Sequence, residues 1–316
     1  MTTPEIPKAS SNTLLDPKND FVFKKLFAGA PVLLAALINA VRSGEPPVTV
    51  VEVLNPSITP EDLAGKFIVL DILAQDALGR RYNIEMQVRR YKAYSARSTY
   101  YLAHALTGQL GGGQDYHLLK GAIGIHLLDF ELFDGPGQQN QAIWCFEMRD
   151  RQQPSIKLGD ELQLNIIEMR KADRLKLAPP ELADLLTFFE HWKEESIMSQ
   201  IESAPIQQAL AQLKALSADA ATREIAWNRQ RALISEITER RAEHEEGKIE
   251  GKIEGKIEGK IENQIAVLQK VLVKRFGPLP EDWRARLAGA SSEQLEHWID
   301  AALDDPATLA AVFTEH

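Results

Sequence analysis

The apolar and polar positions of the first half of the chain predict an alternation of helices and strands. Apolar residues at helical spacing indicate helices, and short apolar or alternating runs between turn residues indicate strands. On this basis we expect helices at 14–28, 31–41 and 91–110, a β-favouring stretch at 48–54, and strands at 67–73, 81–88, 121–130 and 141–149. Asp16 is the expected N-cap of the first helix, and Gly111–Gly113 the expected end of the third. This order indicates an α/β core.

The second half of the chain is predicted to be α-helical. Residues 181–245 read as helix throughout, and the tetrapeptide Gly-Lys-Ile-Glu then occurs four times in succession between Gly247 and Glu262. A compact helical tail follows. We therefore expect a loose polar N-terminus and four further parts, at 1–13, 14–170, 171–246, 247–262 and 263–316.

The Gly-Lys-Ile-Glu repeat supports two interpretations. A period of four residues places the isoleucines on one slowly drifting helical stripe. Glycine at every fourth position weakens such a helix by about 1 kcal/mol each relative to alanine, so the helix is marginal alone. The repeat is either a stalk through which two chains dimerise or a spacer that expanded by duplication. The expected assembly is a homo-oligomer, a dimer formed through the C-terminal helical half.

Composition narrows the class of protein. The chain has 316 residues, of which 44% are hydrophobic, enough for about two packed domains. The single cysteine, Cys145, excludes an internal disulfide and a cysteine-rich zinc site, and its apolar neighbours predict a buried, inert thiol. No apolar run approaches the length of a membrane span, and no signal peptide is visible. We expect a soluble cytoplasmic protein that does not contact a membrane.

Charge is unevenly distributed along the chain. The formal net charge of −9 argues against a protein that simply coats DNA, because non-specific binding depends on Lys and Arg neutralising phosphates. Within residues 80–97, however, six basic residues accompany one acid, Glu85. This segment indicates either a surface that binds a short stretch of nucleic-acid backbone or an ordinary solvated helix face.

The predicted β-hairpin brings candidate metal ligands together. With a turn centred on Leu78, Asp71 lies opposite Glu85, and Gln87 shares the face of Glu85 because side chains alternate along a strand. Two like charges in apolar strands are costly to bury, and a divalent cation would neutralise them. Hard oxygen ligands suit magnesium, which can activate a bound water. The alternative is a partly exposed hairpin edge with ordinary polar residues.

The stretch from Leu15 to about Phe133 resembles the Rpn recombination-promoting nucleases, also described as PD-(D/E)xK family transposases. The resemblance rests on four segments, 16–27 (DPKNDFVFKKLF), 70–72 (LDI), 84–87 (IEMQ) and 97–101 (RSTYY). It implies a restriction-endonuclease-like fold, a mixed sheet flanked by helices, together with a divalent metal, Mg²⁺ or Mn²⁺, and cleavage of DNA. The tail also resembles a small helical domain of unknown function that often ends such proteins.

By position, the resemblance implies roles for four residues. Asp71 and Glu85 would be the two metal carboxylates, and Asp20 a possible third ligand. Gln87 occupies the place of the motif's lysine, where it would orient water or phosphate. An amide carries no charge to stabilise an anionic transition state, so this replacement bears directly on activity.

Other polar and aromatic residues near the hairpin are candidates for simpler roles. Arg89, Arg90 and Arg97 are possible DNA-phosphate contacts, although Arg97 could equally form a surface ion pair. Tyr101 is expected in the core, and His126 as a hydrogen-bonded core histidine.

Two functions from different classes remain open at this point. The first is a metal-dependent DNA endonuclease that hydrolyses phosphodiester bonds, linked by the resemblance to recombination or mobile elements; a dimer would be the simplest way to cut both strands. The second is a catalytically inactive DNA-binding or oligomeric scaffold, which Gln87 and the acidic net charge favour. RNA is not excluded as a substrate.

Overall fold

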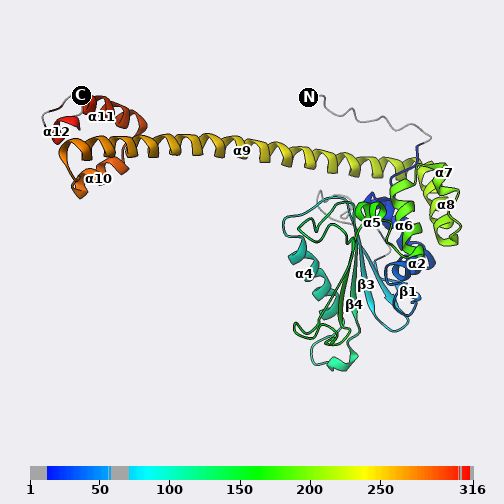
Figure 1. Cartoon of the computed structure of the whole chain (residues 1–316). Helices are drawn as coiled ribbons and strands as arrows, with labels where there is room; N and C mark the ends of the chain where they lie inside the picture. Colours follow the sequence, from blue (N-terminus) through cyan, green and yellow to red (C-terminus); the bar gives the residue numbers. More distant parts are fainter. Residues whose placement is uncertain (1–12, 56, 58–70, 305, 307, 314–316) are drawn as a thin grey trace. The chain divides into compact units, whose positions relative to one another are not determined.

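A mixed sheet forms the centre of the first part of the chain (Figure 1). The structure is a computed structural model that describes residues 13–55, 57, 71–304, 306 and 308–313, and within these ranges six strands form the sheet in the order β1-β2-β3-β4-β6-β5. They are β1 (Val50–Val53), β2 (Ile72–Asp76), β3 (Arg81–Gln87), β4 (Ala122–Leu128), β5 (Ile143–Glu147) and β6 (Leu162–Glu168). The strands β3, β4 and β6 are parallel, and the outer strands pair antiparallel.

The two faces of the sheet carry different helices because side chains alternate along each strand. On one face, Tyr82, Ile84 and Met86 of β3 join the main hydrophobic core. The helices that share this core are α1 (Asp20–Ala28), α2 (Pro31–Val41), α6 (Pro180–His191) and α8 (Ala204–Ala218). The opposite face is covered by α4 (Tyr94–Thr107), which lies along β3 and β4 (Figure 1). The short helices η1 (Tyr116–Leu118), α5 (Met169–Leu175) and α7 (Glu195–Met198) complete this part.

A buried ion pair holds the connection between β4 and β5. The side chains of Glu168, which ends β6, and Lys171 are both fully buried, with 2.8 Å between Oε2 and Nζ. Lys171 Nζ also donates to the backbone carbonyls of Phe133, Gln138 and Gln141, and Glu168 accepts from Trp144 Nε1 and two backbone amides. Because each ion has several partners, this pair satisfies the condition under which a buried charge is tolerated.

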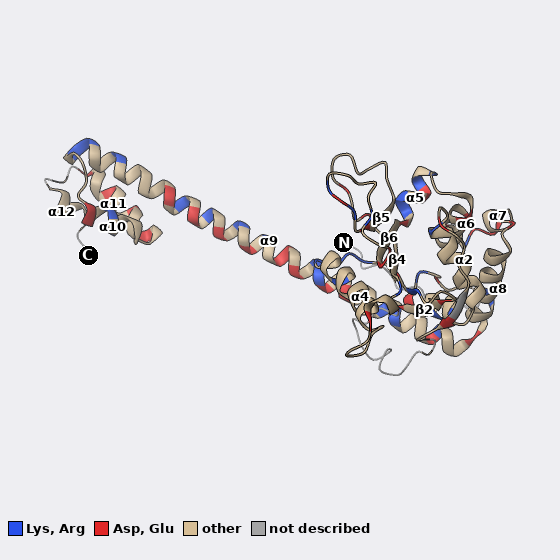
Figure 2. Ribbon diagram, turned by 90° about the horizontal axis from the view of Figure 1, so that it is seen from below, with Lys and Arg blue, Asp and Glu red and all other residues tan. Residues whose placement is uncertain are grey.

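The chain divides into two compact units between Leu233 and Ile234. The helix α9 (Ala220–Phe276) contributes its first turns to the first unit and its last turns to the second, and acidic and basic residues alternate along it (Figure 2). In the second unit, α10 (Glu281–Ala288), α11 (Ser292–Leu303) and α12 (Leu309–Val312) enclose a small core with Leu268, Trp298 and Phe313. Gly277, at a φ of 85°, ends α9 in the left-handed region that favours glycine.

Most elements expected from the pattern are present, with several differences. The strand predicted at 67–73 lies largely outside the described residues, and β2 begins at Ile72. The first helix starts at Asp20 with Asn19 as its N-cap, so the prediction of Asp16 was wrong: its side chain instead accepts from the amide of Lys18. The third helix ends at Thr107 with Gly108 as its C-cap, before the predicted glycines.

Two further differences concern β6 and the edge strand β5. The strand β6 was not predicted. Cys145 is exposed, not buried, because β5 is an edge strand and presents its side chain outward.

Among the described residues, no single helix is long and apolar enough to cross a membrane. The helices α1 and α2 meet that test only as a pair bent by 108°.

The ion pair of Glu168 and Lys171 should be a large contributor to stability. Replacing Lys171 with Met leaves Glu168 buried without its counter-ion, which should lower the free energy of unfolding by about 3–5 kcal/mol. The matched control is Lys176→Met: its ammonium pairs with Asp173 but is 70% exposed, so the loss should stay within about 1 kcal/mol. Urea unfolding followed by circular dichroism measures both. Equal effects of the two substitutions would contradict the prediction.

Candidate functional site

The face of β3 that lies under α4 is polar and buried. Asn83, Glu85 and Gln87 alternate with the core residues of the strand, and their exposed fractions are 5%, 3% and 3%. Glu85 accepts from Asn83 Nδ2 at 2.9 Å and from Gln87 Nε2 at 2.5 Å. A carboxylate in the interior is therefore flanked on its own strand by two amide donors.

The hairpin register agrees with the sequence-based expectation. Ile72 pairs with Ile84 and Leu73 with Asn83. The paired strand begins at Ile72, and the same register continued by one residue would put Asp71 opposite Glu85. Opposite residues of an antiparallel pair present their side chains on one face. Asn55 holds the start of β2: its amide donates to Asp71 at the backbone oxygen, 3.2 Å, and at Oδ1, 3.4 Å, and its Oδ1 accepts from Leu73 N.

His126 is the neighbour of Glu85 on β4. The two residues are register partners, and Nε2 of His126 lies 4.0 Å from Oε1 of Glu85. Nδ1 of His126 lies 2.8 Å from the hydroxyl of Tyr94 on α4. Burial holds the pKa of His126 below its ordinary value, although the charge of Glu85 acts in the opposite direction. The prediction of a hydrogen-bonded core histidine is confirmed.

The polar face contains acceptor atoms that the protein itself does not satisfy. Asn83 Oδ1 and Gln87 Oε1 are buried and have no hydrogen-bond partner. Within the described part of the chain, no group of three His, Cys, Asp or Glu side chains could hold a metal ion. The available donors are instead one buried carboxylate, amide oxygens and the facing Asp71, all hard oxygen atoms of the kind that Mg²⁺ accepts alongside water. This donor set fits a divalent cation.

The other acid proposed for the site has a different partner. Asp20 opens α1 and forms a two-point ion pair with Arg229 of α9. Lys18, in the same opening motif, is buried and donates to Asp129 Oδ1 at 2.9 Å. Asp129 follows β4, and its backbone amide donates to Gln87 O. The opening motif therefore ties α1 to α9 and to the carboxyl end of β4.

The three candidate phosphate-binding arginines lie just beyond β3. Arg89 and Arg97 lie over the ring of Tyr91, with Cζ 4.5 and 5.1 Å from the ring centroid. Arg97 also lies 5.3 Å from the centroid of Tyr101. Arg90 is exposed and lies 3.6 Å from Asp134. Tyr101 is 39% exposed, so its expected place in the core was wrong.

Sequence reasoning missed two members of this site. Asn83 could have been found, because it is two residues before Glu85 on the same strand and therefore shares the face of Glu85 and Gln87. Tyr94 could not, because its contact with His126 joins residues 32 positions apart.

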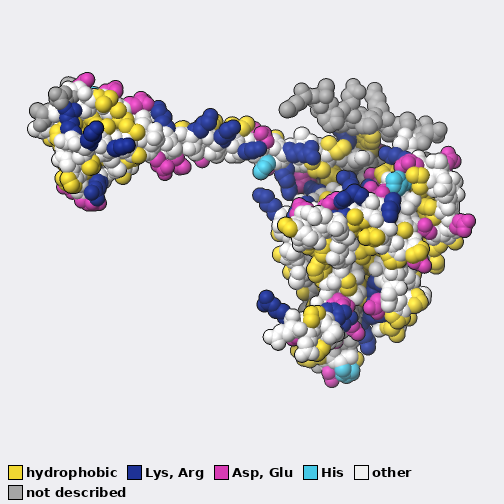
Figure 3. Space-filling view, in the orientation of Figure 1, with side chains coloured by type: hydrophobic (Ala, Val, Ile, Leu, Met, Phe, Trp, Pro, Cys, Tyr) yellow, Lys and Arg dark blue, Asp and Glu magenta, His cyan; other side chains and the backbone are white. Residues whose placement is uncertain are grey.

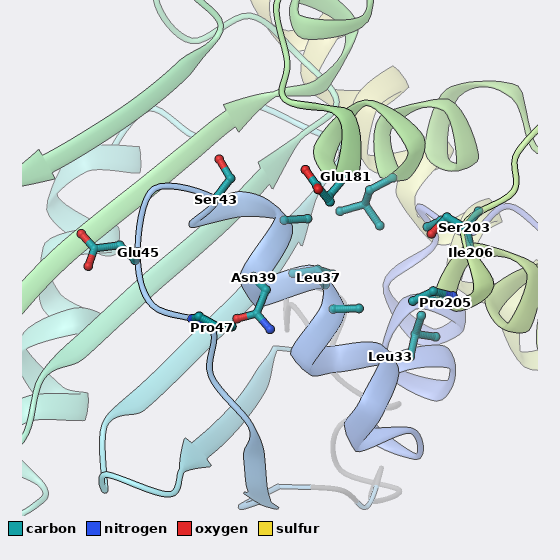
Figure 4. A pocket seen from close by; sticks show the side chains of 13 residues that line it. Leu33, Leu37, Asn39, Ser43, Glu45, Pro47, Glu181, Ser203, Pro205 and Ile206 are labelled. Atoms are coloured by element: carbon teal, nitrogen blue, oxygen red, sulfur yellow. The ribbon is translucent and has the colours of Figure 1, made fainter.

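A separate pocket lies on the other side of the sheet (Figure 4). It has a volume of about 330 Å³ and is lined by α2, α6 and the start of α8, including Leu33, Leu37, Asn39, Glu181 and Ile206. None of the candidate site residues lines it.

Comparison with known proteins gives one match. The model of a family described as "PD-(D/E)XK nuclease family transposase" matches residues 17–240. No curated protein and no solved structure matches the chain. Together with the mixed sheet, this match confirms the resemblance stated above and the restriction-endonuclease-like core followed by an α-helical half.

The hydroxyl of Tyr94 should contribute measurably to stability. In Tyr94→Phe, His126 Nδ1 stays buried with only the distant Ser98 Oγ, 3.5 Å away, so the free energy of unfolding should fall by about 1–3 kcal/mol. Tyr101→Phe on the same helix removes a hydroxyl from a residue that is 39% exposed and should change stability little. Thermal and urea unfolding test the pair. Equal stability of the two variants would show that the hydrogen bond contributes nothing.

Proposed function

Because the chain belongs to the PD-(D/E)XK nuclease family transposases, we propose that its first unit is a metal-dependent endonuclease that hydrolyses phosphodiester bonds of DNA. The observation that carries this proposal is the buried face of β3. Glu85 lies there between two amides whose own oxygens have no partner. The register of Ile72 with Ile84, continued by one residue, supports a position of Asp71 opposite Glu85. A role in recombination or in the movement of mobile elements follows from the family.

In this proposal, Asp71 and Glu85 hold Mg²⁺ or Mn²⁺, and Asn83 or Gln87 adds an amide oxygen. Such an ion, when bound, lowers the pKa of a water ligand and neutralises charge on the scissile phosphate. Gln87 orients the attacking water or a phosphate oxygen through its amide, since it has no charge to contribute. Arg89 and Arg97 bind the flanking phosphates. Asp20 is not needed, because Arg229 occupies both of its oxygens.

The second candidate is a catalytically inactive DNA-binding or oligomeric scaffold. It is favoured by Gln87, which stands where the family's motif has lysine, and by the net charge of −9. The two candidates share the fold and differ in one measurable property, hydrolysis.

Nicking of supercoiled plasmid separates the two candidates. With Mg²⁺ or Mn²⁺ the wild-type protein should nick the plasmid, and EDTA should stop it. Asp71→Ala and Glu85→Ala should each lower the rate by about 100-fold or more, because each removes a group that positions charge in the transition state. Glu161→Gln, an exposed acid before β6, is the matched control and should keep the wild-type rate. Intact plasmid with retained DNA binding would support the scaffold instead.

We further propose that the Gly-Lys-Ile-Glu repeat pairs two copies of the chain. The repeat lies within α9, and Ile249, Ile253 and Ile257 are 52–53% exposed. Basic and acidic side chains are exposed along this helix (Figure 3). On a helix, each Lys lies about 100° to one side of the following Ile, and each Glu about 100° to the other side. An apolar stripe with one basic and one acidic flank is the arrangement through which coiled coils select their partners.

The order of these flanks selects a parallel pair. When two parallel helices face each other through their isoleucines, the Lys flank of one meets the Glu flank of the other. In an antiparallel pair, Lys meets Lys and Glu meets Glu, which is repulsive. The stripe drifts by about 40° per unit, so contact should centre on one or two units rather than extend along all four.

Cysteine cross-linking tests both the pairing and its direction. In a Cys145→Ser background, Ile249→Cys alone should give a covalent dimer on mild oxidation, because parallel pairing places the two copies of residue 249 together. Ile253→Ser with Ile257→Ser should convert the dimer to a monomer in sedimentation. A monomeric wild-type protein would make the repeat a spacer. Cross-links that form only when Ile249→Cys and Ile257→Cys chains are mixed would show an antiparallel pair.

A further inference from the structure

The outer side of α4 is unusually aromatic for a solvated helix face. Tyr94, Ser98 and Leu102 face the sheet and are buried, while Tyr100 and Tyr101 are 66% and 39% exposed. Large exposed aromatic rings in a cluster mark binding surfaces more often than chance. We refer to Tyr91, Arg97, Tyr100, Tyr101 and His104 as the α4 aromatic face.

The members of the α4 aromatic face are in mutual contact. The ring of Tyr100 lies edge-on to Tyr101, with 5.6 Å between centroids, and parallel to His104 at 6.3 Å. The guanidinium of Arg97 lies over both Tyr101 and Tyr91. Its Nε is buried without a hydrogen-bond partner. The aromatic rings and the Arg97 guanidinium thus form one continuous surface, and the Nε–H of Arg97 still lacks a hydrogen-bond acceptor.

The charge around this surface is positive and matches a phosphate chain. No Asp or Glu occurs between Glu85 and Asp115, whereas Arg89, Arg90, Lys92 and Arg97 all lie in that interval. Arg90 lies 3.6 Å from the carboxylate of Asp134. In a chain with 45 acidic residues, an acid-free stretch of this length leaves a local field that attracts anions.

The α4 aromatic face also adjoins the candidate site. From the buried side of the same helix, Tyr94 and Ser98 reach His126, the register partner of Glu85. Arg97 precedes Ser98, so the aromatic face begins within one residue of a side chain that contacts the site. One side of α4 thus contacts the candidate site, and the other side carries the aromatic face.

We propose that the α4 aromatic face binds single-stranded DNA by stacking unpaired bases on Tyr100 and Tyr101 while Arg97 and its neighbours contact phosphates. Duplex bases already stack on one another and offer no free face to a tyrosine ring. Unpaired bases do, and each base stacked on an aromatic side chain changes affinity by about 5- to 150-fold. The substrate class is thus single-stranded DNA or the unpaired part of a junction. Cleavage of this DNA by the chain rests on the proposed function, whereas binding of this DNA to the α4 aromatic face does not.

Fluorescence anisotropy in EDTA tests binding without cleavage. The full chain is titrated into labelled single-stranded DNA of about 16 nucleotides, the upper end of the usual site size, and into the matching duplex. Wild type should prefer the single strand. Tyr100→Leu with Tyr101→Leu removes two stacking rings, so it should weaken single-strand binding by about 25-fold or more and leave duplex binding unchanged. Circular dichroism checks that α4 remains folded.

Two controls isolate the role of the rings. Tyr100→Phe with Tyr101→Phe keeps the π faces and should keep the affinity. Tyr116→Leu removes a tyrosine that is 81% exposed outside α4 and should have no effect. The inference is overturned if the Leu pair weakens neither form or both equally, if the Phe pair behaves like the Leu pair, or if RNA of the same sequence binds more tightly than DNA. If the Asp71→Ala and Glu85→Ala variants both still nick plasmid while the stacking result holds, only the proposed metal site is refuted.

Discussion

Burial of the Glu85 carboxylate is the constraint on which the arrangement of the first unit depends. Removing a carboxylate from water costs several kcal/mol even after the protein relaxes. Two neutral amides and a histidine offset only part of that cost, and each amide adds an unsatisfied oxygen of its own. The strand cannot relieve this by slipping one residue, because Tyr82, Ile84 and Met86 would then leave the main core for the polar side. The apolar face of β3 thus holds the polar face in place.

Ion pairs at the carboxyl ends of the parallel strands also hold the end of β3 in place. Asp129, after β4, is held by Lys18 from the opening motif and by the two-point contact of Arg170. Its backbone amide in turn donates to the carbonyl of Gln87. One strand further, the pair of Glu168 and Lys171 anchors the connection from β4 to β5. The end of β3 that carries Gln87 is therefore connected, through Asp129, to the buried Lys18 just before α1 and to the exposed Arg170 of α5.

The parts of this fold that sequence reasoning found are those set by local pattern. The β2–β3 hairpin follows from period-two alternation around an Asp–Gly turn, and Gly79 takes the positive φ that such a turn requires. The strand β6 escaped notice because Gln163 and Asn165 interrupt its apolar run. Their partners are Arg42 for Gln163 and the carbonyl of Gly124 for Asn165, which lie 121 and 41 residues away. Asn165 also donates to Gln163 Oε1 at 3.2 Å. Buried polar residues whose other partners are distant in sequence do not show the apolar pattern of a strand.

The acidic net charge of the chain and the proposed nucleic-acid substrate conflict only if charge is averaged over the whole molecule. Net charge sums over all 316 residues, but at physiological salt an exposed charge acts over only about 8 Å. The sequence between Glu85 and Asp115, which includes α4, contains four Lys and Arg residues and no acid. Asp134, an acid from another part of the chain, lies 3.6 Å from Arg90. A phosphate chain approaching α4 would therefore meet a basic surface, and the net charge of −9 does not argue against its binding there.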